Sequence, residues 1–252
     1  MSNRPIALQM YTLRDAVQAD IVGTLRAVAE LGYGAVELHT LGGLSAAALR
    51  TELDTLGLQV CGMHIGLDRL ERQLDAELAD MHTLGGQYVV CPSLPPDRRG
   101  SAEGYRTLAR TLTQIGRACR EQGFRFCYHN HDFEFQRFGD TTGFDILFST
   151  ADPTLVQSEL DVYWAAFAGH DPAALLRRMK GRVPLVHLKD MTAGPSPTFA
   201  EVGHGVLDFP AILAAADEAG AEWPIVEQDV CAHPPLESVG MSLAYLRSLG
   251  RT

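Results

Sequence analysis

Carboxylate, imidazole and ammonium side chains gather at the ends of several short apolar runs of this chain. Four successive runs end in the segments 128–134 (YHNHDFE), 159–161 (ELD), 187–190 (HLKD) and 227–229 (EQD), and an earlier run ends at His64. Because alternate side chains of a strand lie on one face, each segment presents a polar pair to one side: His129 with His131, Glu159 with Asp161, His187 with Lys189, and Glu227 with Asp229. Carboxylates gathered in one volume repel one another, and a divalent cation would offset the repulsion. Mixed oxygen and nitrogen ligands favour Mn, Co, Fe, Mg or Zn without choosing among them.

Each of these residues also has an ordinary structural interpretation. A histidine at a strand end is more often a hydrogen-bonded structural residue than a ligand, and an aspartate there is as often a helix cap or the partner of a cation. Four successive runs that all end in metal-binding residue types are hard to assemble by chance, so we predict one shared metal site. Other residues keep two interpretations: Glu37 and Gln9 could only line a pocket, Glu159 could pair with an arginine, Lys189 could pair with Asp161 or Glu159, and Trp164 could be pocket wall or core.

Eight short apolar or β-branched runs must position these residues. They cover 6–11, 35–39, 58–64, 87–91, 124–129, 155–161, 184–188 and 224–228. Between them lie stretches with apolar residues at helical spacing, such as 21–31, 67–78 and 108–115. Strand followed by helix, repeated eight times in about 250 residues, predicts an α/β protein with a single (β/α)8 TIM barrel, whose active site lies at the carboxyl ends of the strands. A doubly wound sheet is less favoured, since no G-x-G-x-x-G follows the first run.

Glycine and proline mark the ends of the helical stretches. Four glycines follow the last apolar residue of a stretch, as expected for left-handed C-caps: Gly32, Gly57, Gly85 and Gly220. Asp171 directly precedes Pro172 and Asp208 lies two residues before Pro210, as expected for N-caps with a proline in the first turn. No serine/glycine linker, low-complexity tract or charge block divides the chain, so we predict one domain over residues 1–252.

The composition excludes several classes of function. Hydrophobic residues make up 46% and charged residues 21% of the 252 residues, which is typical of a folded globular protein. With 21 Lys and Arg against 31 Asp and Glu, the formal charge of -10 has the wrong sign for a nucleic-acid partner. The apolar stretch near residue 6 is too short for a signal peptide or a membrane span, so we expect a cytoplasmic protein without a membrane partner. Five cysteines without a C-x-x-C pair predict reduced core residues.

The order and spacing of seven segments resemble the sugar phosphate isomerase/epimerase family of xylose isomerase-like TIM barrels. The segments are 8–14 (LQMYTLR), 34–38 (GAVEL), 128–131 (YHNH), 159–164 (ELDVYW), 187–190 (HLKD), 203–209 (GHGVLDF) and 226–229 (VEQD). Members of that family bind one divalent metal through a Glu, an Asp, a His and a Glu from the fifth to eighth strands. The resemblance implies that Asp161, His187 and Glu227 are the last three ligands. The first ligand is open, because His129-Asn130-His131 replaces the Glu-Asn-His of relatives, and either His129 or Glu134 could fill the position.

The resemblance implies a metal-dependent isomerase or epimerase that acts on a small keto-sugar, sugar phosphate or cyclitol. The metal, for example manganese, would polarise a carbonyl and stabilise an enediolate intermediate, with Glu227 as the base. His129, His131 or Lys189 could donate a proton, and Asp229 and Gln228 could orient ligands. We expect substrate contacts from His64, His131, Trp164 and Glu37, and leave a homo-oligomer open.

Two other functions compete with this one. Epimerases of the family use two metal-bound glutamates on opposite faces of the substrate, and the histidine-rich fifth strand resembles inosose dehydratases instead. The second hypothesis is therefore a lyase with the same metal site, either a dehydratase or an enzyme that eliminates from a 3-keto-glycoside. The third is a barrel that binds a sugar without converting it. A Cys127–His129 nucleophile pair is a weak alternative, and the 203–205 segment (GHG) could bind a phosphate or only turn the chain.

Overall fold

Eight parallel strands close into a barrel within the described part of the chain. The computed structural model describes residues 4–251, so the predicted domain limits at residues 1 and 252 lie outside the described residues. The barrel strands are β1 (Ala7–Gln9), β2 (Ala35–Leu38), β3 (Gln59–His64), β4 (Tyr88–Cys91), β5 (Arg125–His129), β8 (Gln157–Asp161), β9 (Leu185–Leu188) and β12 (Trp223–Val226). Neighbours pair in the order β1-β12-β9-β8-β5-β4-β3-β2. The predicted (β/α)8 barrel is confirmed, with one strand for each apolar run.

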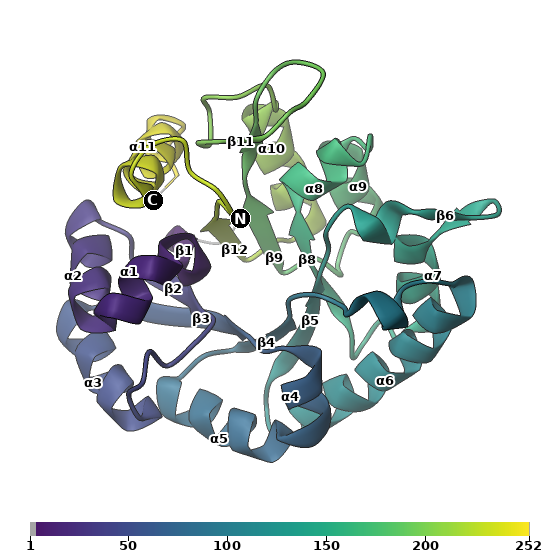
Figure 1. The fold of residues 1–252 in the computed structure, drawn as a ribbon, viewed down its shortest axis with the longest axis horizontal. Helices are drawn as coiled ribbons and strands as arrows, with labels where there is room; N and C mark the ends of the chain where they lie inside the picture. Colours follow the sequence, from purple (N-terminus) through teal and green to yellow (C-terminus); the bar gives the residue numbers. More distant parts are fainter. Residues whose placement is uncertain (1–3, 252) are drawn as a thin grey trace.

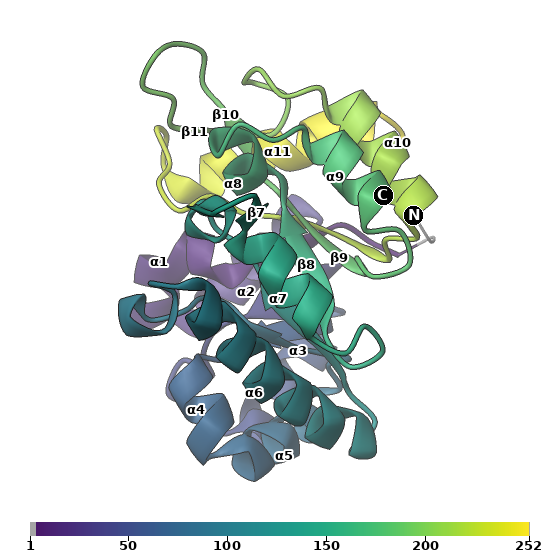
Figure 2. The ribbon, with the colours of Figure 1, turned by 90° about the vertical axis from the view of Figure 1, so that its right-hand side faces the viewer.

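Helices surround these strands (Figure 1). In chain order the α-helices are α1 (Arg14–Ala19), α2 (Ile21–Leu31), α3 (Ala46–Leu56), α4 (Leu67–Arg72), α5 (Leu74–Leu84), α6 (Ala102–Glu121), α7 (Gly143–Thr150), α8 (Val162–Phe167), α9 (Pro172–Arg178), α10 (Phe209–Ala219) and α11 (Pro235–Ser248). The 3-10 helices are η1 (Met10–Leu13), η2 (Pro96–Arg98) and η3 (Phe133–Phe135). Two short antiparallel ladders pair β6 (Arg137–Phe138) with β7 (Thr141–Thr142), and β10 (Asp190–Met191) with β11 (Phe199–Ala200). The loop between β10 and β11 stands out beyond the strands in Figure 2.

The predicted caps define most helix ends. The four C-cap glycines, Gly32, Gly57, Gly85 and Gly220, all have positive φ and end α2, α3, α5 and α10. The Asp171 and Asp208 carboxylates accept backbone N–H bonds at the starts of α9 and α10. The amphipathic stretch 67–78 differs from a continuous helix, because Gln73 has a φ of -135° and separates α4 from α5.

The barrel interior changes from apolar to polar along the strand direction. Apolar side chains fill the part nearer the amino ends of the strands: Ala7, Ala35, Cys61, Tyr88, Val90, Cys127, Leu185, Trp223 and Ile225. Two positions further along five of these strands, alternation turns a buried polar side chain inward: Gln9, Glu37, His129, His187 and Glu227. The register between β2 and β3 shifts after Val36, and this bulge lets Cys61 and His64 both face the interior. The barrel therefore concentrates its polar groups near one end.

Four of the five cysteines are the core residues that the sequence predicted, and Cys231 is only half-buried. All five are free, and Cys61, Cys91, Cys119 and Cys127 are buried. Burial raises the pKa of the Cys127 thiol well above its usual value, so this thiol is not poised as a nucleophile beside His129. Across residues 4–251, no helix has both the length and the apolar character that crossing a bilayer requires.

Candidate active site

Buried imidazoles and carboxylates from neighbouring strands meet at the carboxyl end of the barrel. Two groups of four residues each place one ligand atom per residue within 4.8 Å of the others. We call His129, Asp161, His187 and Glu227 the outer group, and His64, His129, Glu159 and His187 the inner group. The names follow the positions of two residues on β8: Asp161, in the outer group, lies two residues closer to the carboxyl end of the strand than Glu159, in the inner group.

The outer group offers two imidazole nitrogens and two carboxylate oxygens. His187 Nδ1 lies 2.7 Å from Glu227 Oε2, and His129 Nε2 lies 3.7 Å from Asp161 Oδ2. Asp161 is fully buried; its Oδ1 accepts a hydrogen bond from the Trp164 N–H, and its Oδ2 lies 3.0 Å from Lys189 Nζ. Burial raises the pKa of Asp161 to about 6 although Lys189 and His187 lower it. A divalent cation fits this donor set, because its charge would offset the two buried carboxylates and such cations accept mixed nitrogen and oxygen ligands.

Lys189 is the ammonium beside these carboxylates. Its fully buried Nζ lies 3.0 Å from Asp161 Oδ2, 2.7 Å from Glu227 Oε2 and 2.8 Å from Asp229 Oδ2. Burial alone would lower the pKa of Lys189, but the three carboxylates raise it well above its usual value. For Glu227, burial favours a higher pKa, yet Lys189 and His187 hold it well below the usual range. Lys189 and Glu227 therefore form an ion pair at the site, and the Asp161 ion pair considered from the sequence is present as well.

Glu159, a member of the inner group, contacts the three histidines of that group. The sequence left an arginine partner open, but Glu159 Oε2 lies 2.7 Å from His64 Nε2, 3.0 Å from His129 Nδ1 and 3.2 Å from His187 Nε2. Glu37 Oε2 lies 2.7 Å from His187 Nε2 and 3.2 Å from His64 Nε2. Burial alone would lower the pKa of His64, but these two carboxylates raise it to about 10. Glu159 and Glu37 thus sit directly against imidazoles of the site.

Glu134 lies outside both groups. The Tyr128 hydroxyl donates a hydrogen bond to Glu134 Oε1, and the backbone N–H of His131 donates to Glu134 Oε2 at 2.7 Å. Burial raises the pKa of Glu134 to about 7. Both carboxylate oxygens therefore hold the turn after β5. Of the two residues that the sequence offered for the fifth-strand ligand, the structure places His129 among the grouped ligand atoms.

A cavity of about 320 Å³ opens onto the outer group. Its lining consists of Tyr11, His39, His64, Gly66, Arg69, Pro92, Ser93, His129, His131, Lys189, Glu227 and Asp229. Ligand pockets in proteins span about 300–1,000 Å³, so this volume suits a small-molecule ligand.

The expected substrate contacts divide into two sets. His64 and His131 line the cavity, whereas Glu37 is fully buried behind His187. Trp164 is not part of the lining and packs behind it, with its ring 5.5 Å from that of His131 and 5.8 Å from Lys189 Nζ. Burial lowers the pKa of His131 to about 3, so this imidazole is neutral at pH 7.

Several lining residues were not selected from the sequence. His39 directly follows β2 and Tyr11 follows β1, so their places at strand ends were the available signal. Ser93 and Arg69 come from the loop after β4 and from α4, and no local pattern distinguishes them.

The 203–205 segment turns the chain through contacts with Asp190. The buried Asp190 carboxylate accepts N–H bonds from Gly203 at 3.0 Å, Gly205 at 2.9 Å and Leu207 at 3.0 Å. Gly203 has a φ of +84° and its Cα packs against the Tyr245 ring, so a side chain would not fit. Because the glycine N–H groups are engaged within the loop, this segment is a turn and not a phosphate cradle.

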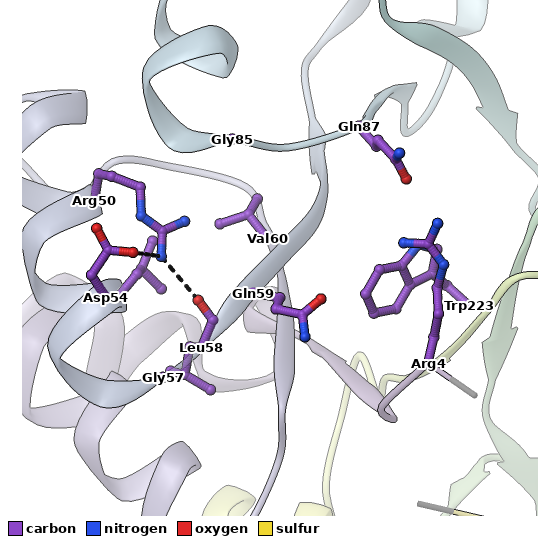
Figure 3. A pocket seen from close by; sticks show the side chains of 11 residues that line it. Arg4, Arg50, Asp54, Gly57, Leu58, Gln59, Val60, Gly85, Gln87 and Trp223 are labelled. Carbon is purple, nitrogen blue, oxygen red and sulfur yellow. Dashed lines mark hydrogen bonds and ion pairs between the residues drawn. The ribbon is translucent and has the colours of Figure 1, made fainter. Parts of the chain in front are cut away.

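A second cavity, of about 560 Å³, lies at the opposite end of the barrel (Figure 3). Its lining includes Gln59 and Trp223, the first residues of β3 and β12. Arg50 donates there to the carbonyl oxygens of Leu84 at 2.7 Å and Leu58 at 3.1 Å, which secures the ends of α5 and α3. No residue of the outer or inner group lines this cavity. Since TIM barrels place their chemistry at the carboxyl ends of the strands, the smaller cavity is the candidate active site.

The fold and the site together define the class of protein. It is a parallel TIM barrel whose carboxyl end gathers buried histidines and carboxylates, the residue types that bind metals. Residues 25–249 match the family of xylose isomerase-like TIM barrels, and this protein belongs to that family. An inosose dehydratase from Geobacillus kaustophilus is 29% identical over 89% of this chain and 86% of its own length. A sugar phosphate isomerase/epimerase from Parabacteroides distasonis has the same fold, with a TM-score of 0.81 at 24% identity over 98% of this chain and 95% of its own. The IOLI protein, solved with a bound zinc atom, has a TM-score of 0.72 at 16% identity over 98% and 97% of the two chains.

Proposed function

We propose that this protein is a divalent-metal-dependent dehydratase of a small keto-cyclitol or keto-sugar. The observation that carries the proposal is the outer group, His129, Asp161, His187 and Glu227, beside a cavity that Glu227 and Lys189 both line. The isomerase that the sequence analysis placed first becomes the alternative, because the curated relative with the higher identity is named a dehydratase. Solved isomerase/epimerase relatives support the fold alone at 24% identity.

The residues of the outer group would hold the cation, and Glu227 and Lys189 would move the protons. A bound divalent cation would polarise a substrate carbonyl and stabilise the enediolate charge. Glu227, kept ionised by Lys189 and His187, would remove the proton from the carbon next to the carbonyl. The C–O bond at the following carbon then breaks, and Lys189 protonates the departing hydroxyl. A carbon–carbon double bond forms and the hydroxyl leaves as water with the proton from Lys189. The proton taken by Glu227 then passes to Lys189 Nζ, 2.7 Å away, which restores both groups.

The arrangement favours elimination over epimerisation. An epimerase needs a second proton carrier on the opposite face of the substrate, and the family supplies it with a glutamate on the fifth strand. Here His129 occupies that position in the outer group, and the Glu134 carboxylate is bonded to Tyr128 and His131. The proposed dehydration needs one base and one proton donor, and Glu227 and Lys189 stand 2.7 Å apart at the cavity.

The test measures the mass of the product that the metal-loaded protein forms. The purified protein is loaded with Mn²⁺ or Co²⁺ and incubated with inosose in deuterated buffer, beside Glu227→Gln and a control, Glu201→Gln. Glu201 is also a buried glutamate, but its carboxylate accepts a hydrogen bond from the Ser238 hydroxyl and belongs to neither group. We expect the product to have lost the mass of one water in wild type and in the control, and no product with Glu227→Gln.

Other outcomes distinguish the competing functions. A product of unchanged mass that has gained deuterium would identify an isomerase or epimerase. Binding of the sugar without exchange or loss of water, unaffected by Glu227→Gln, would identify a binding protein. The cytoplasmic location stays a prediction, and so does the homo-oligomer that the sequence analysis left open.

A further inference from the structure

Each imidazole of the outer group has a buried carboxylate against its other ring nitrogen. His187 turns Nδ1 toward Glu227 and its Nε2 lies 2.7 Å from Glu37 Oε2. His129 turns Nε2 toward Asp161 and its Nδ1 lies 3.0 Å from Glu159 Oε2. Glu37 and Glu159 are both fully buried, and neither lines the cavity. They therefore touch the histidines without being placed to touch a substrate.

A neutral imidazole carries one proton and offers the lone pair of its other nitrogen to a metal. An ionised carboxylate only accepts hydrogen bonds, so a carboxylate beside one ring nitrogen keeps the proton on that nitrogen. Glu227 Oε2 lies equally close to His187 Nδ1, at 2.7 Å, but Glu227 is itself a member of the outer group. A cation bound there would take the Nδ1 lone pair while Glu37 keeps the proton on Nε2, and Glu159 would likewise leave the His129 Nε2 lone pair. We propose that Glu37 and Glu159 are positioning residues that select opposite ring nitrogens of His187 and His129 for the metal, an inference that rests on the proposed metal site.

The two carboxylates are themselves held by the barrel. Gln9 Nε2 donates to Glu37 Oε2 at 2.8 Å, and His64 Nε2 lies 2.7 Å from Glu159 Oε2. Strand register enforces these neighbours, because Gln9 pairs with Glu37 across β1 and β2, and His129 pairs with Glu159 across β5 and β8. Two relays result, one through Gln9, Glu37 and His187, the other through His64, Glu159 and His129.

The inner group offers the rival placement of the cation. There Glu159 would be a direct ligand, and both shared histidines would use the ring nitrogens that now face Glu37 and Glu159. Two members of each group line the cavity: His129 and Glu227 of the outer group, and His64 and His129 of the inner group. The outer group is favoured because its carboxylate Glu227 faces the cavity, whereas Glu159, the carboxylate of the inner group, does not. Two measurements distinguish these placements of the cation: the metal affinity of variants, and the ring nitrogen that carries the proton in His187 and His129.

The experiment measures Co²⁺ binding to the metal-stripped full-length protein by calorimetry, for wild type, Glu37→Gln, Glu159→Gln and the control Glu201→Gln. Loss of a carboxylate behind a metal-binding histidine raises Kd about 10- to 100-fold. We expect each of the first two variants to bind one equivalent with Kd raised in this range, and the control to stay within about twofold of wild type. Thermal unfolding verifies that each variant is folded.

A second measurement needs no variant. Long-range proton–nitrogen NMR of the zinc-loaded, histidine-labelled wild type should show the proton of His187 on Nε2 and that of His129 on Nδ1. The opposite pattern, or unchanged Kd in both variants, overturns the inference. So does loss of binding in Glu159→Gln while Asp161→Asn still binds, since the inner group would then hold the cation. Normal metal binding with these protonation sites but no dehydration refutes the proposed reaction and leaves the inference standing.

Discussion

Replacing Lys189 with methionine removes the ammonium that compensates the carboxylates of the site. Lys189 Nζ lies within 3.0 Å of oxygens of Asp161, Glu227 and Asp229, and the first two residues are buried. Removing one partner of a buried ion pair costs about 3–5 kcal/mol, because the remaining charge is left uncompensated. A protein of this size loses about 2–4 °C of Tm per kcal/mol. We therefore expect the Tm of metal-free Lys189→Met to fall by about 6–20 °C.

The assay is thermal unfolding with and without excess Mn²⁺. The cation should raise the Tm of Lys189→Met more than that of wild type, because it replaces the missing positive charge. Lys180→Met is the matched control: Lys180 is the other lysine of the chain and is exposed, so its replacement should change stability by less than about 0.5 kcal/mol. An unchanged Tm for metal-free Lys189→Met, or equal Mn²⁺ shifts in both proteins, would refute the charge-compensation argument.

Two further predictions concern the loops around the site. Asp190→Asn should lower stability by about 2–4 kcal/mol, since charge-assisted hydrogen bonds to the Gly203, Gly205 and Leu207 N–H groups are lost or weakened; denaturant unfolding measures the change, and a loss below about 0.5 kcal/mol would contradict it. Glu134→Gln tests the pH dependence. The folded-state pKa of Glu134 is raised from 4.5 to about 7, so the folded protein holds this proton more tightly and wild-type stability declines as pH rises between these values. Over that window Glu134→Gln should gain about 3 kcal/mol relative to wild type, and a difference independent of pH would refute the burial of an ionisable carboxyl there.

Much of the fold followed from local patterns. Each apolar run became a strand, and Gly32 or Asp208 ended or began its helix as expected, because alternation, capping and left-handed glycines are properties of a few consecutive residues. The same alternation, with the family resemblance, singled out Asp161, His187 and Glu227, and the structure gathers all three.

The partners of these residues depended on the tertiary structure. Whether His129 or Glu134 lies in the outer group is decided by the turn after β5, where the Tyr128 hydroxyl and the His131 N–H donate hydrogen bonds to Glu134. Glu159 faces imidazoles instead of an arginine because β8 lies beside β5 in the barrel. The sequence alone predicts which face of its own strand each side chain occupies, because side chains alternate along a strand. The distance between side chains on different strands is set by register, bulges and barrel closure, so only the folded barrel decides which carboxylate stands behind which histidine.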